Sequence, residues 1–144
     1  MFYALQPVVP GMLGECTGNL QARPPRVEKL HYIFLYGYLD DIIQDVGIFL
    51  ATDAFQDAVN SLNPSGATFT RENLIVETDH YQFDELWPEL VTRIKEYSWL
   101  KPSGVPGVDD FGITEDCMLV ISARVKKAIE KLDLSRCQIE LYSS

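Results

Sequence analysis

The stretch Phe49–Phe69, FLATDAFQDAVNSLNPSGATF, decides the expected fold. It opens with an apolar, strand-like run that ends at Thr52, whose hydroxyl can cap the first turn of a helix. After Thr52, apolar side chains recur at positions i, i+3, i+4 and i+7, which is the spacing of one buried helical face. A turn at Ser65 precedes a second strand at Phe69. The stretch therefore predicts a unit of strand, capped helix, turn and strand.

The same pattern returns in Leu119–Ile139, LVISARVKKAIEKLDLSRCQI, where Ser122 takes the capping position. We expect two similar amphipathic helices, near Asp53–Asn63 and Ala123–Asp133, packed on one mixed or largely antiparallel sheet. A second interpretation stays open, because matched apolar patterns also arise between unrelated segments. The expected fold class is α+β.

The rest of the chain predicts shorter elements. Strands are expected at Phe2–Val8, Leu30–Tyr36, Asn73–Glu77 and Arg93–Leu100. A helical turn ended by Pro88 is expected at Phe83–Trp87, and Asp40 or Asp41 is expected to cap another before Gly47. Residues 11–18 are expected to be irregular, with loops at Asn19–Pro25 and Lys101–Gly107. No linker divides the chain, so residues 1–144 are expected to form a single domain.

The composition is that of a globular protein. Hydrophobic residues make up 47% of the chain, charged residues 23% and aromatic residues 11%. No apolar run reaches the length of about 18 residues that a membrane span needs. The first residues lack the basic start of a signal peptide, so we expect a cytoplasmic protein. The cysteines Cys16, Cys117 and Cys137 form no CxxC pair, which favours free thiols over disulfides or zinc ligation.

The net charge of −9 is unevenly distributed. Residues 30–70 hold five acids and no lysine or arginine, and residues 77–116 hold ten acids against three basic residues. Such a surface repels phosphate backbones and anionic lipids, which argues against nucleic acid or a membrane as the ligand. It attracts basic proteins instead. The other interpretation is that the acids only keep the protein soluble.

No catalytic or metal-binding motif stands out. His31 lies in an aromatic strand pattern and His80 in a turn, and neither is part of a known nucleophile motif. Neither acidic pair fits a calcium-loop pattern. We therefore expect no enzyme activity, no cofactor and no metal site. A small enzyme that uses Cys16 or an acidic pair is the less favoured alternative.

The expected site is a protein-binding surface in which aromatic residues accompany acids. Tyrosine and tryptophan are the usual anchors of protein interfaces, whereas most aromatic side chains in strands belong to the core. The acidic surface is drawn from residues 38–45 and 77–89, with the loop 105–116 as a second candidate. The candidate contact residues are Tyr38, Asp40, Asp41, Asp45, Asp79, Tyr81, Asp84, Glu85, Trp87, Asp109 and Asp110.

Several short phrases also occur in a familiar order along nearly the whole chain. They are Tyr3–Pro7, Gly11–Glu15, Pro24–Tyr32, Trp99–Lys101, Gly107–Gly112 and Leu119–Ser122. In this order and spacing the chain resembles the bacterial immunity-protein family numbered eleven of polymorphic-toxin systems. Residues 37–47 resemble the family least.

The resemblance implies a cytoplasmic antidote that binds and neutralises the toxin domain of its own bacterium, without catalysis. The partner would be a protein with a basic surface, and its identity and the oligomeric state are left open. The motif Asp109-Asp110-Phe111-Gly112 has a structural interpretation as well, with Phe111 in the core and Asp110 holding a turn. An adaptor or chaperone for a secreted effector is the alternative function.

Overall fold

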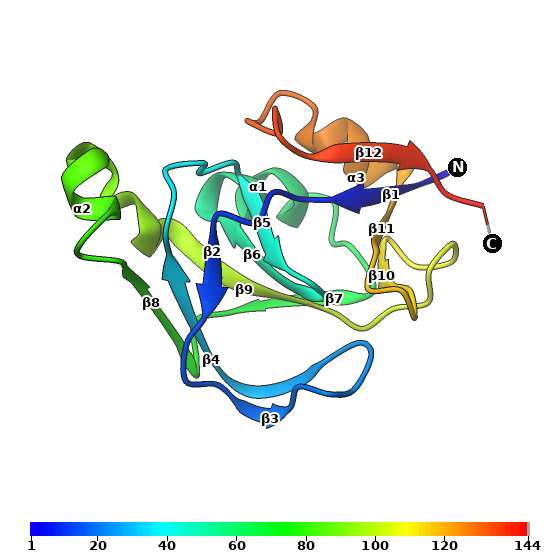
Figure 1. Ribbon diagram of the computed structural model, residues 1–144. Helices are drawn as coiled ribbons and strands as arrows, with labels where there is room; N and C mark the ends of the chain where they lie inside the picture. The colour runs from blue at the N-terminus through cyan, green and yellow to red at the C-terminus, as the bar shows by residue number, and fades with distance from the viewer. Residues whose placement is uncertain (144) are drawn as a thin grey trace.

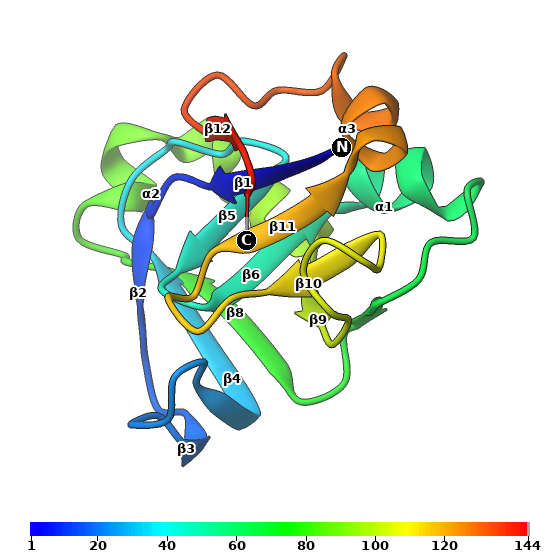
Figure 2. The same ribbon diagram turned by 90° about the vertical axis from the view of Figure 1, so that its right-hand side faces the viewer.

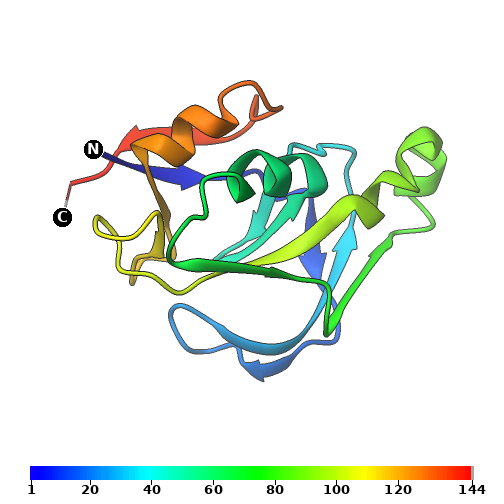
Figure 3. The same cartoon turned by 180° about the vertical axis from the view of Figure 1, so that it is seen from behind.

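The computed structural model describes residues 1–143 and shows one α+β domain. Among these residues, twelve strands form three four-stranded sheets, and two helices, α1 (Asp53–Asn60) and α3 (Ala123–Ile129), lie side by side (Figures 1 and 3). A third, one-turn helix, α2 (Phe83–Leu86), projects at the end of the molecule opposite β1 (Phe2–Gln6) (Figure 1). The expected fold class is confirmed.

The first sheet holds the first copy of the repeated pattern. Its strand order is β5-β6-β9-β7, from Ile42–Asp45, Ile48–Thr52, Tyr97–Pro102 and Ala67–Thr70. All three neighbouring pairs are antiparallel. Helix α1 leaves directly from β6, because Thr52 ends the strand and accepts a hydrogen bond from the Phe55 amide at 3.3 Å.

The second sheet repeats this arrangement strand for strand. Its order is β10-β11-β1-β12, from Phe111–Ile113, Leu119–Ser122, Phe2–Gln6 and Gln138–Leu141 (Figure 2). Helix α3 leaves from β11 at Ser122, which accepts a hydrogen bond from the Val125 amide at 3.3 Å. The sequence repeat is therefore a repeat in the structure. It includes both capping residues, as predicted.

The register of the two sheets is also the same. Leu50 in β6 pairs with Ile43 and Trp99, and the equivalent Val120 in β11 pairs with Gly112 and Ala4. Within residues 1–143, the two sheets differ in the position of the third strand in the chain. Strand β9 follows its unit, whereas β1 precedes its unit.

The expectation of one sheet beneath both helices is wrong. Each helix follows a strand of a different sheet, and the two helices contact each other across a core that both sheets share. Apolar residues at positions i, i+3 and i+4 specify which face of a helix is buried, but they do not specify which sheet covers that face. The buried residues of this shared core are Leu5, Ile42, Phe49, Ala51, Phe55, Val59, Leu100, Phe111, Leu119, Ile121, Val125 and Ile129.

The third sheet has no counterpart in the repeat and covers the other face of the first sheet. It consists of β2 (Gly11–Leu13), β4 (Arg26–Phe34) and β3 (Thr17–Asn19), with β8 (Leu74–Thr78) parallel to β4. Together with α2 it closes a second core. The buried residues of that core are Leu30, Tyr32, Phe34, Leu39, Ile43, Ile48, Leu50, Phe83, Ile94, Tyr97 and Trp99.

Three local predictions are wrong. Residues 11–18, expected to be irregular, contain β2 and β3, because both pair with the long strand β4. No helical turn follows Asp40 and Asp41, since Ile42 and Ile43 enter β5, which turns into β6 at Gly47 with φ of 80°. Residues Arg93–Glu96 form a 3-10 turn rather than a strand, and β9 begins only at Tyr97. Another 3-10 turn, Pro88–Leu90, follows α2.

Within residues 1–143, no helix has the length and apolar character needed to cross a bilayer.

Candidate protein interface

The exposed end of the third sheet carries a mixed aromatic and acidic surface, which we call the α2 corner. It is formed by α2, the turn that leads into it from β8, and the loop that follows β4 (Figure 1). The Asp79 amide donates to the Phe34 carbonyl at 2.9 Å and so joins the two loops. The residues of the α2 corner are Tyr36, Tyr38, Asp79, Tyr81, Asp84, Glu85, Leu86 and Trp87.

Aromatic rings form the framework of the α2 corner. Tyr36 and Tyr38 stack with ring centroids 5.6 Å apart and an interplanar angle of 15°. Trp87 lies edge-on to Tyr38 at 6.4 Å and packs on Phe83 at 5.6 Å. Gly37 allows this packing, because a Cβ atom there would lie 2.6 Å from the Trp87 ring. The rings are therefore held in place before any partner binds.

Several apolar side chains of the α2 corner are open to solvent. Tyr81 is 91% exposed and Leu86 60% exposed, and the two stacked rings are 39% and 41% exposed. A group of exposed apolar side chains surrounded by acids is typical of a protein-binding surface. A single exposed residue would carry no such meaning.

The acids of the α2 corner differ in whether their carboxylates already bind other groups of the protein. Asp79 Oδ1 accepts from the Tyr81 amide at 3.2 Å and shapes the turn before α2. Asp84 accepts from the Thr78 hydroxyl and contacts His80 Nδ1 at 2.9 Å. Glu85 is exposed and forms no ion pair within residues 1–143. Glu85 is thus the carboxylate most open to a partner.

The hydrogen bond between His80 and Asp84 shifts the pKa of both side chains. The hydrogen bond with Asp84, with its negative charge, raises the pKa of His80 above its ordinary value of 6.5. The bonds from His80 and from the Thr78 hydroxyl lower the pKa of Asp84. Both side chains therefore carry charge together between their two ordinary pKa values, 3.8 for Asp84 and 6.5 for His80.

Asp40 is buried, whereas it is predicted as a residue of an exposed contact surface. Its side chain is fully buried and accepts from Arg136 twice, from Nη1 and from the backbone amide, both at 2.9 Å. The Arg136 guanidinium in turn lies over the Tyr38 ring at 5.1 Å from its centroid. Asp40 therefore holds Arg136 in place against the Tyr38 ring of the α2 corner.

Asp41 and Asp110 are also predicted contacts that the structure buries. Asp41 accepts from the Asp133 amide at 2.8 Å, and Arg93 lies 3.9 Å from its carboxylate. Asp110 binds Arg124 through both carboxylate oxygens, at 2.9 and 2.7 Å. The Arg124 pair lowers the pKa of Asp110 well below its usual range. These acids hold loops together, because a buried carboxylate needs a hydrogen-bonded partner.

The last two predicted acids lie away from the α2 corner. Asp45 sits at the β5-β6 turn, where its Oδ1 accepts from the Val46 amide at 3.0 Å. Asp109 Oδ2 accepts from the Val105 amide at 2.7 Å and braces the loop before β10. The structural interpretation of the Asp109–Gly112 motif is confirmed, since Phe111 is fully buried. The predicted acids therefore do not form one continuous face, and only those on residues 77–87 gather with exposed aromatic rings.

Sequence reasoning missed two contributors to the α2 corner, Leu86 and Arg136. Tyr36 is not in the predicted set of contact residues, although it adjoins turns and acids in the sequence as Tyr38 does. Leu86 lies next to acids in the sequence, and nothing in the local sequence indicates that its side chain is exposed. Arg136 could not be found, since its contact with Asp40 joins positions 96 residues apart.

A cysteine nucleophile, the less favoured alternative, would need a histidine base beside Cys16. Its thiol donates to the His31 carbonyl at 3.5 Å and accepts from the His31 amide at 3.3 Å. Both ring nitrogens of His31 are occupied, by the Glu15 amide at 3.0 Å and by Glu77 at 2.6 Å. No ring nitrogen is free to take the thiol proton. Residues 1–143 also place no cluster of three metal-ligating side chains together.

No protein-family model and no curated protein matches the chain.

Proposed function

We propose that this chain is a protein-binding domain that engages a basic protein partner through the α2 corner. The observation that carries the proposal is that exposed Tyr81 and Leu86 lie beside Glu85, which has no ion pair within residues 1–143, on one short helix and the turn that leads into it. Apolar anchors beside acids suit a partner surface that offers apolar contacts next to lysine or arginine. The acids contribute long-range attraction and the anchors contribute affinity.

Preorganisation supports this choice of surface. The tyrosine stack, Trp87 and Gly37 already fix the framework, so little side-chain entropy is lost when a partner binds. Trp87 is only half-buried, and its ring connects the stacked tyrosines to the core through Phe83. A rigid aromatic base beside a polar rim is the usual arrangement of an interface centre.

The specific role proposed is that of a cytoplasmic immunity protein which neutralises a cognate bacterial toxin domain by binding it. This role rests on the resemblance of the sequence phrases to the immunity-protein family numbered eleven, and the α2 corner supplies a surface for it. A toxin that acts on nucleic acid is basic around its active site, and carboxylates can occupy that site in place of phosphates.

Co-expression with the toxin domain encoded next to this chain, followed by gel filtration, tests the proposal. A single co-eluting peak at micromolar concentration is expected, together with loss of toxin activity in the complex. Two separate peaks would refute it. Full toxin activity within a stable complex would favour the adaptor or chaperone role instead.

A further inference from the structure

Strand β8 pairs with another strand on one side only. It runs parallel to β4, with Leu30 beside Leu74 and Phe34 beside Thr78. Figures 1 and 3 show β8 at the margin of the molecule, where it leads into α2. We call the backbone groups of Leu74 and Val76, on the side away from β4, the β8 edge.

A hydrogen bond at the start of the ladder shows which groups form the β8 edge. The Leu30 amide donates to the Asn73 carbonyl at 2.8 Å, so Asn73 faces β4. Because successive residues of a strand direct their backbone groups to opposite sides, Leu74 and Val76 face away from β4. Within residues 1–143, the amides and carbonyls of these two residues have no hydrogen-bond partner. Buried backbone groups rarely lack a partner, so these groups are open to water.

The β8 edge lacks the features that commonly prevent the addition of a strand. Residues 74–78, LIVET, contain no lysine, proline or glycine, and their register with β4 is continuous, without a bulge. In the first sheet, by contrast, the outer side of β5 is covered by Val8, whose carbonyl accepts from the Gln44 amide at 3.0 Å. The β8 edge can therefore serve as a template for another strand.

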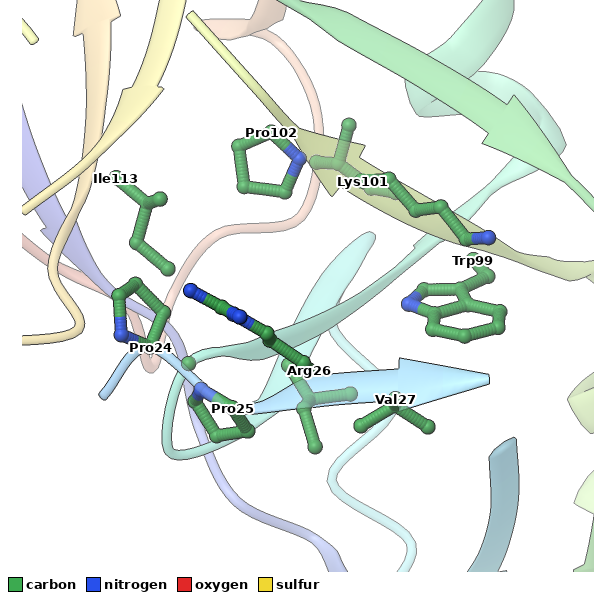
Figure 4. A pocket seen from close by; sticks show the side chains of 11 residues that line it. Pro24, Pro25, Arg26, Val27, Trp99, Lys101, Pro102 and Ile113 are labelled. Carbon is green, nitrogen blue, oxygen red and sulfur yellow. The ribbon is translucent and has the colours of Figure 1, made fainter. Parts of the chain in front are cut away.

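The β8 edge lies in the half of the third sheet that carries the α2 corner. Strand β8 pairs with the second half of β4, and the residue after β8 is Asp79 of the α2 corner. The first half of β4 borders a hollow of about 230 Å³ toward β9, which is lined by Pro25, Arg26 and Trp99 among others (Figure 4). The β8 edge is therefore continuous with the proposed interface and separate from this hollow.

The side chains beside the β8 edge suit a basic partner. Ile75 is 61% exposed, and Glu77, which binds His31 Nε2 at 2.6 Å, keeps 47% of its side chain exposed. Ile75 and Glu77 lie on the same face of β8, because alternate residues of a strand share a face. An apolar side chain next to Ile75 and a lysine or arginine next to Glu77 form favourable cross-strand pairs.

We propose that the basic partner of the α2 corner adds an extended segment to the β8 edge, as a further strand of the third sheet. This inference rests on the proposed function and adds to it the form in which the partner is recognised. Backbone hydrogen bonds to Leu74 and Val76 contribute affinity. Ile75 and Glu77 select a segment in which an apolar residue and a basic residue stand two positions apart.

Amide hydrogen exchange of the ¹⁵N-labelled protein tests this inference, with and without the toxin domain encoded next to this chain. In the free protein, the Leu74 and Val76 amides are expected to exchange rapidly, whereas the Ile75 amide, which faces β4, exchanges slowly. In the complex, exchange of the Leu74 and Val76 amides is expected to slow about tenfold or more. The Ile139 and Leu141 amides, on the side of β12 away from β1, are the matched control and should keep their rates.

The outcomes separate this inference from the function on which it rests. If no complex forms, the proposed function fails and the inference fails with it. If a complex forms and protects amides of the α2 corner, but Leu74 and Val76 still exchange at their free rates, only the inference is overturned. Protection of these two amides in the free protein that increases with protein concentration would assign the β8 edge to a second copy of this chain, which also overturns it.

A proline variant tests the outward amide of the β8 edge directly. Val76→Pro removes this N–H group without removing a bond to β4, and proline is tolerated on an edge strand where the N–H faces solvent. The Val76→Ala control truncates the same half-buried side chain and keeps the amide. The Kd of the complex is expected to be about tenfold or more higher for Val76→Pro than for Val76→Ala. Equal Kd values in two folded variants would overturn the inference, and if Val76→Pro does not fold, the exchange rates decide.

Discussion

Asp41 and Asp110 accept equivalent hydrogen bonds in the two halves of the fold. Each accepts from the capping hydroxyl of its own unit at 2.7 Å, Asp41 from Thr52 and Asp110 from Ser122. Each also accepts from a backbone amide beyond the helix of the other unit, Asp41 from Asp133 at 2.8 Å and Asp110 from Ser65 at 3.0 Å. Through these bonds, each aspartate connects the N-terminal cap of one helix to the loop that follows the other helix.

Substitution of Asp110 by alanine tests how much this connection between the two units stabilises the fold. In Asp110→Ala, the Ser65 amide and the Ser122 hydroxyl lose their acceptor and Arg124 loses its partner. Because Arg124 is half exposed and can be solvated, we expect a loss of about 2–4 kcal/mol in the free energy of unfolding by urea. Glu115→Ala, an exposed acid nearby, serves as the control. A loss no larger than that of the control would contradict the role.

The acid dependence of stability provides a second test of Asp110. Its pKa is lowered in the folded protein, so its ionised form stabilises the fold above the ordinary value near pH 4. This contribution is lost as the pH falls from there toward the lowered pKa. Between pH 5 and pH 2, the free energy of unfolding of the parent is expected to fall more steeply than that of Asp110→Asn. Parallel curves would show that Asp110 does not titrate as described.

The two helix caps are expected to be of similar energetic importance. Thr52→Ala and Ser122→Ala each remove an acceptor for a first-turn amide and a donor to an aspartate. Each should lower the free energy of unfolding by about 1–2 kcal/mol, measured by urea denaturation. A neutral effect at one site would mean that the two units are not stabilised in the same way.

The pair of His80 and Asp84 is open to NMR titration. Because the bond to Asp84 raises the pKa of His80, its imidazole should remain protonated above pH 6.5 in the parent protein. In Asp84→Asn, the pKa should return toward 6.5, whereas Glu85→Gln should leave it almost unchanged. The contribution of the pair to stability is complete between the ordinary pKa values of the two groups, 3.8 and 6.5. It disappears as the pH rises through the raised pKa of His80 or falls through the lowered pKa of Asp84. An identical titration in Asp84→Asn would exclude the interaction.

The repeat and its caps could be predicted because their signals are local. Thr52 and Ser122 each stand directly before an apolar periodicity, and each fixes the start of its own helix. The number of sheets could not be predicted in this way. Whether α1 and α3 cover one sheet or two depends on the pairing of β1 with β11, which joins opposite ends of the chain.

The candidate site was predicted only in part, since burial of an acid is a tertiary property. Asp40 and Asp41 resemble solvated residues in the sequence, and only the fold brings Arg136 and the Asp133 amide to them. Tyr81, Glu85 and Trp87 were found because aromatic residues and acids are adjacent there in the chain itself.

The most direct test of the central claim is the Kd of the complex with the neighbouring toxin domain, measured by calorimetry for two sets of variants. Tyr81→Ala, Glu85→Lys and Leu86→Ala together are expected to weaken binding about 100-fold or more, because the first and last remove apolar anchors and the second reverses an acidic charge. The matched set of Val108→Ala and Glu115→Lys, at exposed positions of the loop around β10, should change the Kd by less than about threefold. An unchanged Kd for the first set, or equal losses in both, would contradict the assignment of the α2 corner as the interface.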